Sequence, residues 1–146
     1  MITPNEYINC ISDDEMIQKA IDESIKKHTF VKIPKYNSRT KTNIWIIKKA
    51  IILYSETKII LDGCHLRMAD DVYTNMFKNS NSDLFGDVSD KRQKNITIIG
   101  KNHPILDGGK YNGLSERGSN KNGLPSIKEN NIVRFTNCKN IQISNI

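Results

Sequence analysis

The chain has 146 residues, of which 37% are apolar and 26% charged, with a formal net charge of +6 at neutral pH. This is the length of one domain, and the modest apolar share predicts a thin core. No apolar run approaches the roughly 18 residues of a membrane span, and residues 1–10 lack the pattern of a signal peptide, so we expect no membrane partner and a cytoplasmic location for the chain as written.

The first predicted element is an amphipathic helix from Asp13 to about Lys27. Ser12 and Glu15 form the pattern of a capping box, in which the Ser12 hydroxyl accepts from the Glu15 N–H and the Glu15 side chain accepts from the Ser12 N–H. Behind this cap, Ile17, Ile21 and neighbouring apolar residues recur on one face, which must pack on an apolar surface.

Short β-rich runs follow this helix, and no second helix of comparable quality separates them. The 23 Ile against only 3 Ala also favour pleated strands over a helical bundle. We expect strands at residues 30–33, 44–47, 50–53, 58–61, 65–68, 96–99, 104–106, 132–135 and 141–146. Residues 69–94 and 108–130, rich in Asn, Asp, Ser, Gly and Lys, are interpreted as polar insertions.

One strand pattern recurs along the chain, beginning at Glu56, Asn95 and Asn140. Recurrence of a strand–turn–strand unit is typical of a solenoid, here a parallel β-helix. Stacking would place Ile59, Ile98 and Ile143 in one interior column, and Leu66 and Ile105 in another. The helix would then be an amino-terminal cap over the first coil.

With this order in place, the sequence resembles the amino-terminal portion of right-handed parallel β-helix proteins of the pectate lyase and polygalacturonase superfamily. The resemblance rests on the helix DDEMIQKAID, the first strand FVKIP, and the segments TKIILDGCHLRM and NITIIGKNHPILDGG. The segment KYNGLSE after the Asp-Gly-Gly turn is most similar to bacterial glycoside-hydrolase-like members.

The resemblance implies an all-β fold, a right-handed parallel β-helix (solenoid) with an amino-terminal α-helical cap. Residues 1–28 would be the amino-terminal segment and capping helix, and residues 29–146 the first coils of a β-helix that continues beyond the given chain. The family's catalytic residues lie on later coils, so the resemblance transfers no catalytic residue. It implies an amino-terminal part of a glycoside hydrolase or polysaccharide lyase, inactive alone, or alternatively a non-catalytic carbohydrate-binding, adhesin-like or tail-spike-like module. For the complete protein, the resemblance leaves secretion open as an alternative location.

Glycosidic bond cleavage usually needs two nearby carboxyl groups. The candidates are Asp70, Asp71 and Asp107, but a solvated loop for Asp70 and Asp71 and a turn for Asp107 are the favoured interpretations. Arg67 and Arg117 offer bidentate forks for a uronate carboxylate, and Tyr111 offers a ring for stacking on a sugar.

No metal and no cofactor are expected. Cys10, Cys64 and Cys138 are odd in number and far apart, which fits neither a disulfide framework nor a zinc site, and His65 and His103 lack further ligands at suitable spacing. We interpret the cysteines as buried thiols.

The partner expected from these observations is a polysaccharide or oligosaccharide, possibly an acidic one. Two basic segments, residues 26–61 and 91–146, would attract an anionic polymer. Because Lys outnumbers Arg 17 to 5, most of this charge is interpreted as solvated surface, and no nucleic acid partner is expected. The substrate, the choice between hydrolase and lyase chemistry, and the oligomeric state stay open.

Overall fold

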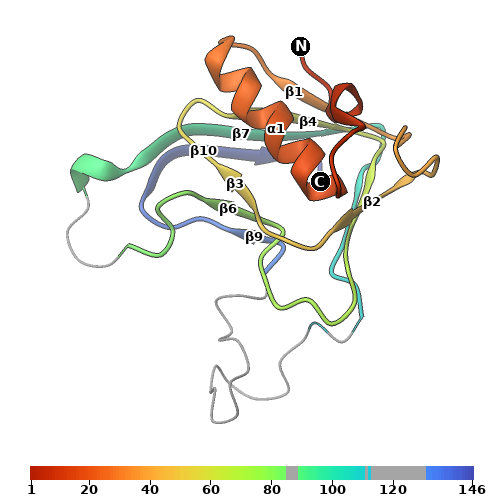
Figure 1. Cartoon of the computed structure of the whole chain (residues 1–146). Coiled ribbons are helices and arrows are strands. Elements are labelled where there is room, and N and C mark those ends of the chain that lie inside the picture. Colours follow the sequence, from red (N-terminus) through yellow and green to blue (C-terminus); the bar gives the residue numbers. More distant parts are fainter. Residues whose placement is uncertain (85–88, 111, 113–130) are drawn as a thin grey trace.

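The computed structural model describes residues 1–84, 89–110, 112 and 131–146 (Figure 1). These residues form an α-helix, α1 (Asp13–Lys26), and the short 3-10 helices η1 (Pro4–Tyr7) and η2 (Ser89–Lys91). The strands are β1 (Val31–Pro34), β2 (Ile44–Ile47), β3 (Ile51–Leu53), β4 (Lys58–Asp62), β5 (His65–Met68), β6 (Phe77–Asn79), β7 (Gln93–Lys101), β8 (Ile105–Asp107), β9 (Val133–Arg134) and β10 (Cys138–Ser144). Among the helices of these described residues, none is long and apolar enough to cross a membrane.

The strands belong to three parallel sheets. The orders are β1-β4-β7-β10, β2-β5-β8 and β3-β6-β9, so the chain contributes one strand to each sheet in turn. Every pair of neighbouring strands is parallel. Segments far apart in sequence, from 21 residues for Ile44 and His65 to 56 for Phe77 and Val133, therefore lie side by side (Figure 1).

The prediction of an all-β, right-handed parallel β-helix with a helical cap is wrong as a fold class. The structure has three separate small parallel sheets together with a 14-residue α-helix, and the sheets do not close into a solenoid. Strands of the second and third sheets are only two to four residues long. Such short strands end before the chain bends, so strand pairing stops between one sheet and the next.

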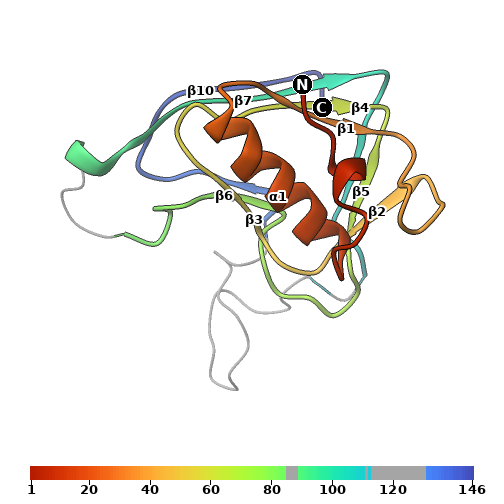
Figure 2. The same cartoon turned by 45° about the horizontal axis from the view of Figure 1, so that its top comes forward.

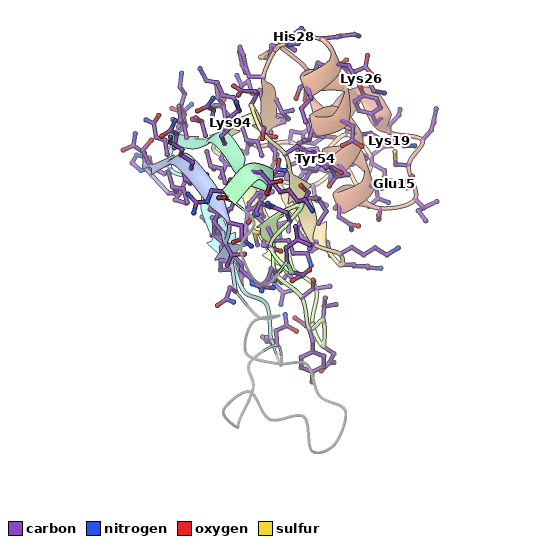
Figure 3. All side chains as sticks on the ribbon, turned by 90° about the vertical axis from the view of Figure 1, so that its left-hand side faces the viewer. Glu15, Lys19, Lys26, His28, Tyr54 and Lys94 are labelled. Carbon is purple, nitrogen blue, oxygen red and sulfur yellow. The ribbon has the colours of Figure 1, made fainter. Side chains whose placement is uncertain are left out.

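The predicted helix is confirmed, and it covers one end of the sheets. Helix α1 contacts β1, β2 and β3 (Figure 2). Met16, Ile17, Ala20 and Ile21 on its inner face are fully buried, and a large apolar side chain contributes roughly 1.5–3 kcal/mol on such burial. The outer face carries Glu15 and Lys19, whose charged atoms are 3.3 Å apart (Figure 3).

The cap of this helix differs in one bond from the predicted capping box. The Ser12 hydroxyl accepts from the Glu15 N–H at 3.4 Å, as expected. The Glu15 carboxylate, however, accepts from the N–H of Ile11 at 3.0 Å and not from that of Ser12. Both bonds still satisfy donors at the start of the helix.

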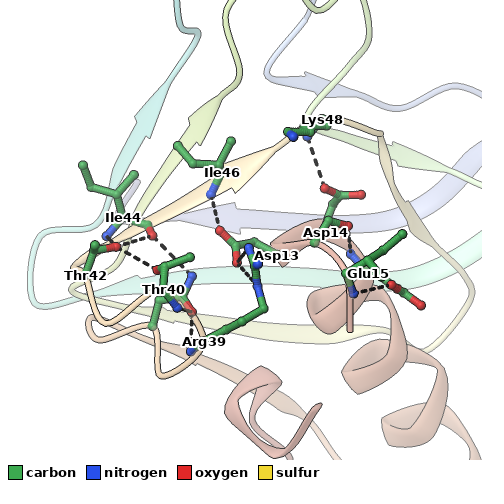
Figure 4. A network of polar contacts seen from close by, with 12 residues as sticks. Asp13, Asp14, Glu15, Arg39, Thr40, Thr42, Ile44, Ile46 and Lys48 are labelled. Carbon is green, nitrogen blue, oxygen red and sulfur yellow. Dashed lines mark hydrogen bonds and ion pairs between the residues drawn. The ribbon is translucent and has the colours of Figure 1, made fainter. Parts of the chain in front are cut away.

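Two acidic side chains in the first turn of α1 hold β2 (Figure 4). Asp13 Oδ2 accepts from the Ile46 N–H at 2.7 Å, and Asp13 Oδ1 accepts from Arg39 Nε and Nη2 at 3.0 and 2.6 Å. Asp14 Oδ1 accepts from the Lys48 N–H at 3.3 Å. The helix thus supplies hydrogen-bond acceptors to a strand that begins its sheet and has no neighbour on this side.

The first strands of the other two sheets are covered in the same way. Gln18 bonds both backbone groups of Ile52 in β3, accepting from its N–H at 2.8 Å and donating to its C=O at 3.1 Å. Next to β1, Ile2 forms a parallel bridge with Val31, with its C=O accepting from the Lys32 N–H at 2.9 Å. All three first strands therefore have partners for backbone groups that would otherwise be buried and unsatisfied.

Strand register agrees with one predicted column and corrects the other. Ile59, Ile98 and Ile143 are aligned across β4, β7 and β10, but only Ile59 and Ile98 are buried, since Ile143 in the last strand of the sheet is 40% exposed. Leu66 is instead aligned with Leu106, whereas Ile105 pairs with His65 and is 54% exposed. The predicted pairing of Leu66 with Ile105 was wrong by one residue, which transfers a side chain from one face of a strand to the other.

A ladder of side chains links the turn just before β4 to the third residue of β7 and the third residue of β10. Glu56, Asn95 and Asn140 all have positive φ, at 68°, 57° and 57°. Asn95 Nδ2 donates to Glu56 Oε1 at 2.7 Å, and Asn140 Nδ2 donates to Asn95 Oδ1 at 3.1 Å. Asn adopts this backbone region more readily than most residues, so the recurring residue and its conformation agree.

Strand β6 lies inside residues 69–94, whose composition predicts a polar insertion. Phe77 is fully buried and pairs with Ile51 on one side and Val133 on the other. Lys78 and Asn79 complete the strand. A run of three residues with one apolar side chain is too short to be detected by alternation.

We predict that Asp13→Ala lowers the free energy of unfolding by about 2–4 kcal/mol, because it leaves the Ile46 N–H and the Arg39 guanidinium without their acceptor. Urea denaturation followed by circular dichroism measures this. The free energy of unfolding of Asp13→Asn should lie between those of the unchanged chain and Asp13→Ala, since an amide oxygen still accepts a hydrogen bond. Glu23→Ala, which removes an exposed pair with Lys27, is the control and should change stability little. An equal loss in the control would contradict the assignment.

Candidate functional site

A row of polar side chains lies on the outer face of the β2-β5-β8 sheet. Alternation along β5 sends Leu66 and Met68 into the core and leaves His65 and Arg67 on the other face. The register places Asp107 of β8 beside Arg67. Strand pairing, and not sequence proximity, therefore brings these groups together.

The Arg67 guanidinium is the centre of this cluster. Its Nη2 donates to Asp70 Oδ1 at 2.6 Å, and its Nε is 3.4 Å from Asp107 Oδ2. Its Nη1 also donates to the backbone oxygen of Met68 at 3.3 Å. The group that we expected to hold a uronate carboxylate thus already contacts two carboxylates of its own chain.

Asp107 connects Arg67 to His65. His65 Nε2 is 3.3 Å from Asp107 Oδ2, and Asp107 Oδ1 accepts from the Gly109 N–H at 2.8 Å. His65 and Asp107 are both partly exposed, with side-chain exposures of 27% and 36%. Both carboxylate oxygens therefore have protein partners while the group stays accessible to solvent.

Asp70 and Asp71 have different surroundings. Asp70 accepts from the Lys110 N–H at 2.9 Å in addition to its contact with Arg67. Asp71 is exposed with φ of 57°, and its backbone N–H donates to the Lys110 C=O at 3.2 Å. Two adjacent acidic residues thus divide into a member of the cluster and a turn residue.

Asn112 holds the two loops that carry these acidic residues. It is 4% exposed, its Oδ1 accepts from the Val72 N–H at 2.8 Å, and its Nδ2 donates to the backbone oxygens of Ala69 and Gly108, both at 2.7 Å. A single amide thereby joins the loop after β5 to the loop after β8. Sequence reasoning missed this residue, because only the fold shows that these two loops are neighbours.

The structure therefore brings together three of the predicted site residues, Arg67, Asp70 and Asp107, and adds His65. Asp71 lies in the neighbouring turn without joining the cluster's side-chain contacts described above. Tyr111 and Arg117 lie outside the described residues. These four joined side chains form the arginine cluster: His65, Arg67, Asp70 and Asp107.

The carboxylates of the arginine cluster are held in the ionised form. The Gly109 N–H, and then His65 and Arg67, lower the pKa of Asp107 below its ordinary value. The pKa of Asp70 is lowered by the Lys110 N–H and then by Arg67. Hydrogen bonds and opposite charges favour the charged form, so neither group stores a proton for general acid catalysis at neutral pH.

Metal-ligating groups do not assemble among the residues that the structure describes, where no three His, Cys, Asp or Glu side chains are placed to hold an ion. Cys64 is fully buried, and burial raises the pKa of its thiol to about 12. It therefore stays protonated and unreactive at neutral pH.

Comparison of the chain with models of protein families, with curated proteins and with solved structures finds no match. The arginine cluster is accordingly interpreted from its own geometry.

We predict a specific acid response of the arginine cluster. The folded-state pKa of Asp107 is lower than its unfolded value, so the stability from its ionised form is fully present above the ordinary Asp pKa of about 3.9 and is lost as the pH falls through the lowered folded value. Carbon-13 NMR titration of the carboxyl groups measures this shift. In Asp107→Asn, the loss of stability that comes from protonating Asp107 at low pH should disappear. If the Asp107 carboxyl of the folded chain titrated at the ordinary Asp pKa, the contacts described for Asp107 would be contradicted.

We also predict that Gly109→Ala disrupts the loop behind Asp107. Gly109 has φ of 73°, and an added Cβ would lie 2.5 Å from the Met68 oxygen and 2.7 Å from Asn112 Nδ2. The substitution should cost more than about 1 kcal/mol of stability and broaden or shift the NMR signals of His65. Gly108→Ala is the matched control, because its Cβ would meet only Ile132 Cδ1 at 3.9 Å.

Proposed function

We propose that this chain recognises a polysaccharide on the outer face of the β2-β5-β8 sheet, as part of a carbohydrate-active protein. The observation that carries the proposal is the arginine cluster, which presents fixed donors and acceptors to solvent on a regular strand surface. Sugar hydroxyls both donate and accept, so they pair well with such a mixed set of charged groups.

Apolar side chains beside the cluster support the same ligand class. Ile44 and Ile105 are 36% and 54% exposed, and they flank His65 in the adjacent strands β2 and β8. Sugar rings carry apolar C–H faces as well as hydroxyls. A polar centre between apolar neighbours therefore suits a sugar ring.

Catalysis is the second candidate, as a glycoside hydrolase or polysaccharide lyase. It is favoured by the placement of two carboxylates, Asp70 and Asp107, on one guanidinium. Hydrolysis usually needs one carboxyl that keeps a proton near neutral pH, however, and both groups here are ionised. Binding without turnover is thus the function that these side chains support best.

The test is a screen of neutral and acidic polysaccharides for binding to the full chain, with reducing ends and unsaturated products assayed in the same samples. Binding without product is the expected result. Release of reducing ends would assign hydrolase activity, and unsaturated products would assign lyase activity.

Asp107→Asn should weaken binding of the selected polysaccharide by about tenfold or more, since it removes a charged acceptor. Asp90→Asn makes the same chemical change at an exposed residue of η2 and is the control. Thermal melts of both variants separate lost binding from lost folding. If no polysaccharide binds, or if folded Asp107→Asn binds as the unchanged chain does, the proposal fails.

A further inference from the structure

A second feature lies beside the arginine cluster and shares one residue with it. This is a groove of about 580 Å³, which receives side chains from four places in the chain: the segment after β1, the start of β2, the β4–β5 turn with β5, and the β7–β8 turn with β8. Its polar lining residues are Lys35, Asn43, Asp62, His65, Asn102 and His103. His65 belongs to both sites.

The one carboxylate in this groove is already neutralised. Asp62 Oδ2 is 2.5 Å from Lys32 Nζ, and Asp62 Oδ1 accepts from Asn102 Nδ2 at 2.5 Å. Lys32 and Asn102 lower the pKa of Asp62, with Lys32 as the larger cause. Because both of its oxygens have donors, Asp62 offers little repulsion to an anion and serves to position Asn102.

The remaining polar groups leave the groove rich in donors. Lys35 is exposed, and within the part of the chain that the structure describes it forms no ion pair. Lys101 adds positive charge beside Asp62. The imidazoles of His65 and His103 line the same groove, and the consecutive residues Asn102 and His103 have φ of 54° and 55°.

The positive φ values explain how the short β7–β8 turn enters the groove. Gly63, also at positive φ (62°), lets the two turns approach: a Cβ there would be 3.3 Å from the backbone oxygen of Asn102. The Gly63 N–H donates to the Lys101 C=O at 2.8 Å. The turn that carries His103 is thus held against the turn that leads to His65.

We propose that this groove binds a tetrahedral oxyanion, a phosphate or sulfate ester carried by the saccharide. Lys35 and His103 bring donors to the groove from two separate elements, and His65 lines it from a third while its Nε2 stays 3.3 Å from Asp107 Oδ2. That arrangement suits the several acceptor oxygens of a tetrahedral group, with the lysine as a point charge, whereas a planar carboxylate is matched by the fork of an arginine. The saccharide carrier rests on the function proposed above, whereas the binding of the oxyanion itself does not.

The three histidines of the chain provide the test, because each gives separate imidazole signals in proton–carbon NMR. His65 and His103 line the groove, and His28 lies beyond the carboxyl end of α1 (Figure 3), lining a different pocket. Sodium sulfate and sodium phosphate are titrated into the full chain at constant pH, with sodium chloride holding the ionic strength constant. We expect His65 and His103 to shift together and to saturate at one dissociation constant, while His28 does not move.

A matched pair of lysine variants tests the assignment to the groove. Lys35→Ala should raise the dissociation constant for sulfate at least about fivefold, since a charge-assisted contact is lost. Lys49→Ala removes the same charge from an exposed residue that does not line the groove and should leave the constant unchanged. Saturation in Lys35→Ala at the original constant would overturn the proposal. Equal shifts of all three histidines, or the same shifts with chloride alone, would also overturn it.

A further comparison separates this inference from the proposed function. Glucose 6-sulfate, glucose 6-phosphate and glucose are each titrated in the same way. Stronger binding of an ester than of glucose supports an oxyanion on a sugar, and the two esters identify which oxyanion is preferred. If free sulfate or phosphate binds in the groove but no saccharide does, the groove stands as an oxyanion site and polysaccharide recognition fails. If a polysaccharide binds while the signals of His65 and His103 do not respond to any oxyanion, the groove fails and recognition stands.

Discussion

The structure depends on how the first strand of each sheet is protected. A first strand has unpaired N–H and C=O groups on one side, which invite pairing with other chains or stay buried without partners. Here Asp13, Asp14 and Gln18 of α1 bond the backbone of β2 and β3, while Ile2 pairs with β1. Helix α1 thus combines an apolar inner face, which excludes water, with side chains that complete the strands it covers.

Both candidate sites follow from this arrangement. Helix α1 fixes β2, and the parallel register then places β5 and β8 beside it with alternate residues facing outward. Arg67 meets Asp107, and His65 lies between Ile44 and Ile105, only because that register is kept. A slip of one residue would bury the charged groups and expose Leu66. The geometry of both candidate sites and the stability of the fold are therefore linked through strand pairing.

Local periodicity predicted the helix and most strands, because apolar residues in those segments recur at helical or strand spacing. Pairing across about forty residues was harder to predict, as the exposure of Ile105 and the missed strand β6 demonstrate. Asp13 and Asp14 were recognisable as acidic residues of a first helical turn, but their bonds to Ile46 and Lys48 connect elements more than thirty residues apart. The contacts of Arg67 with Asp70 and Asp107 were likewise not predictable from the sequence. Each residue alone has the features of a loop, a turn or an exposed strand position.

The ladder of Glu56, Asn95 and Asn140 has a consequence for how such a chain can change in evolution. Its members are 39 and 45 residues apart, yet all three lie at or near the start of equivalent strands in the same backbone conformation. Each member of the ladder thus aligns its strand with the neighbouring strand, and this alignment does not depend on how many residues lie between two members. The segments between members of the ladder are free to lengthen, shorten or diverge in sequence while the sheets keep their strand order. New surface loops can therefore arise here without any change in the core.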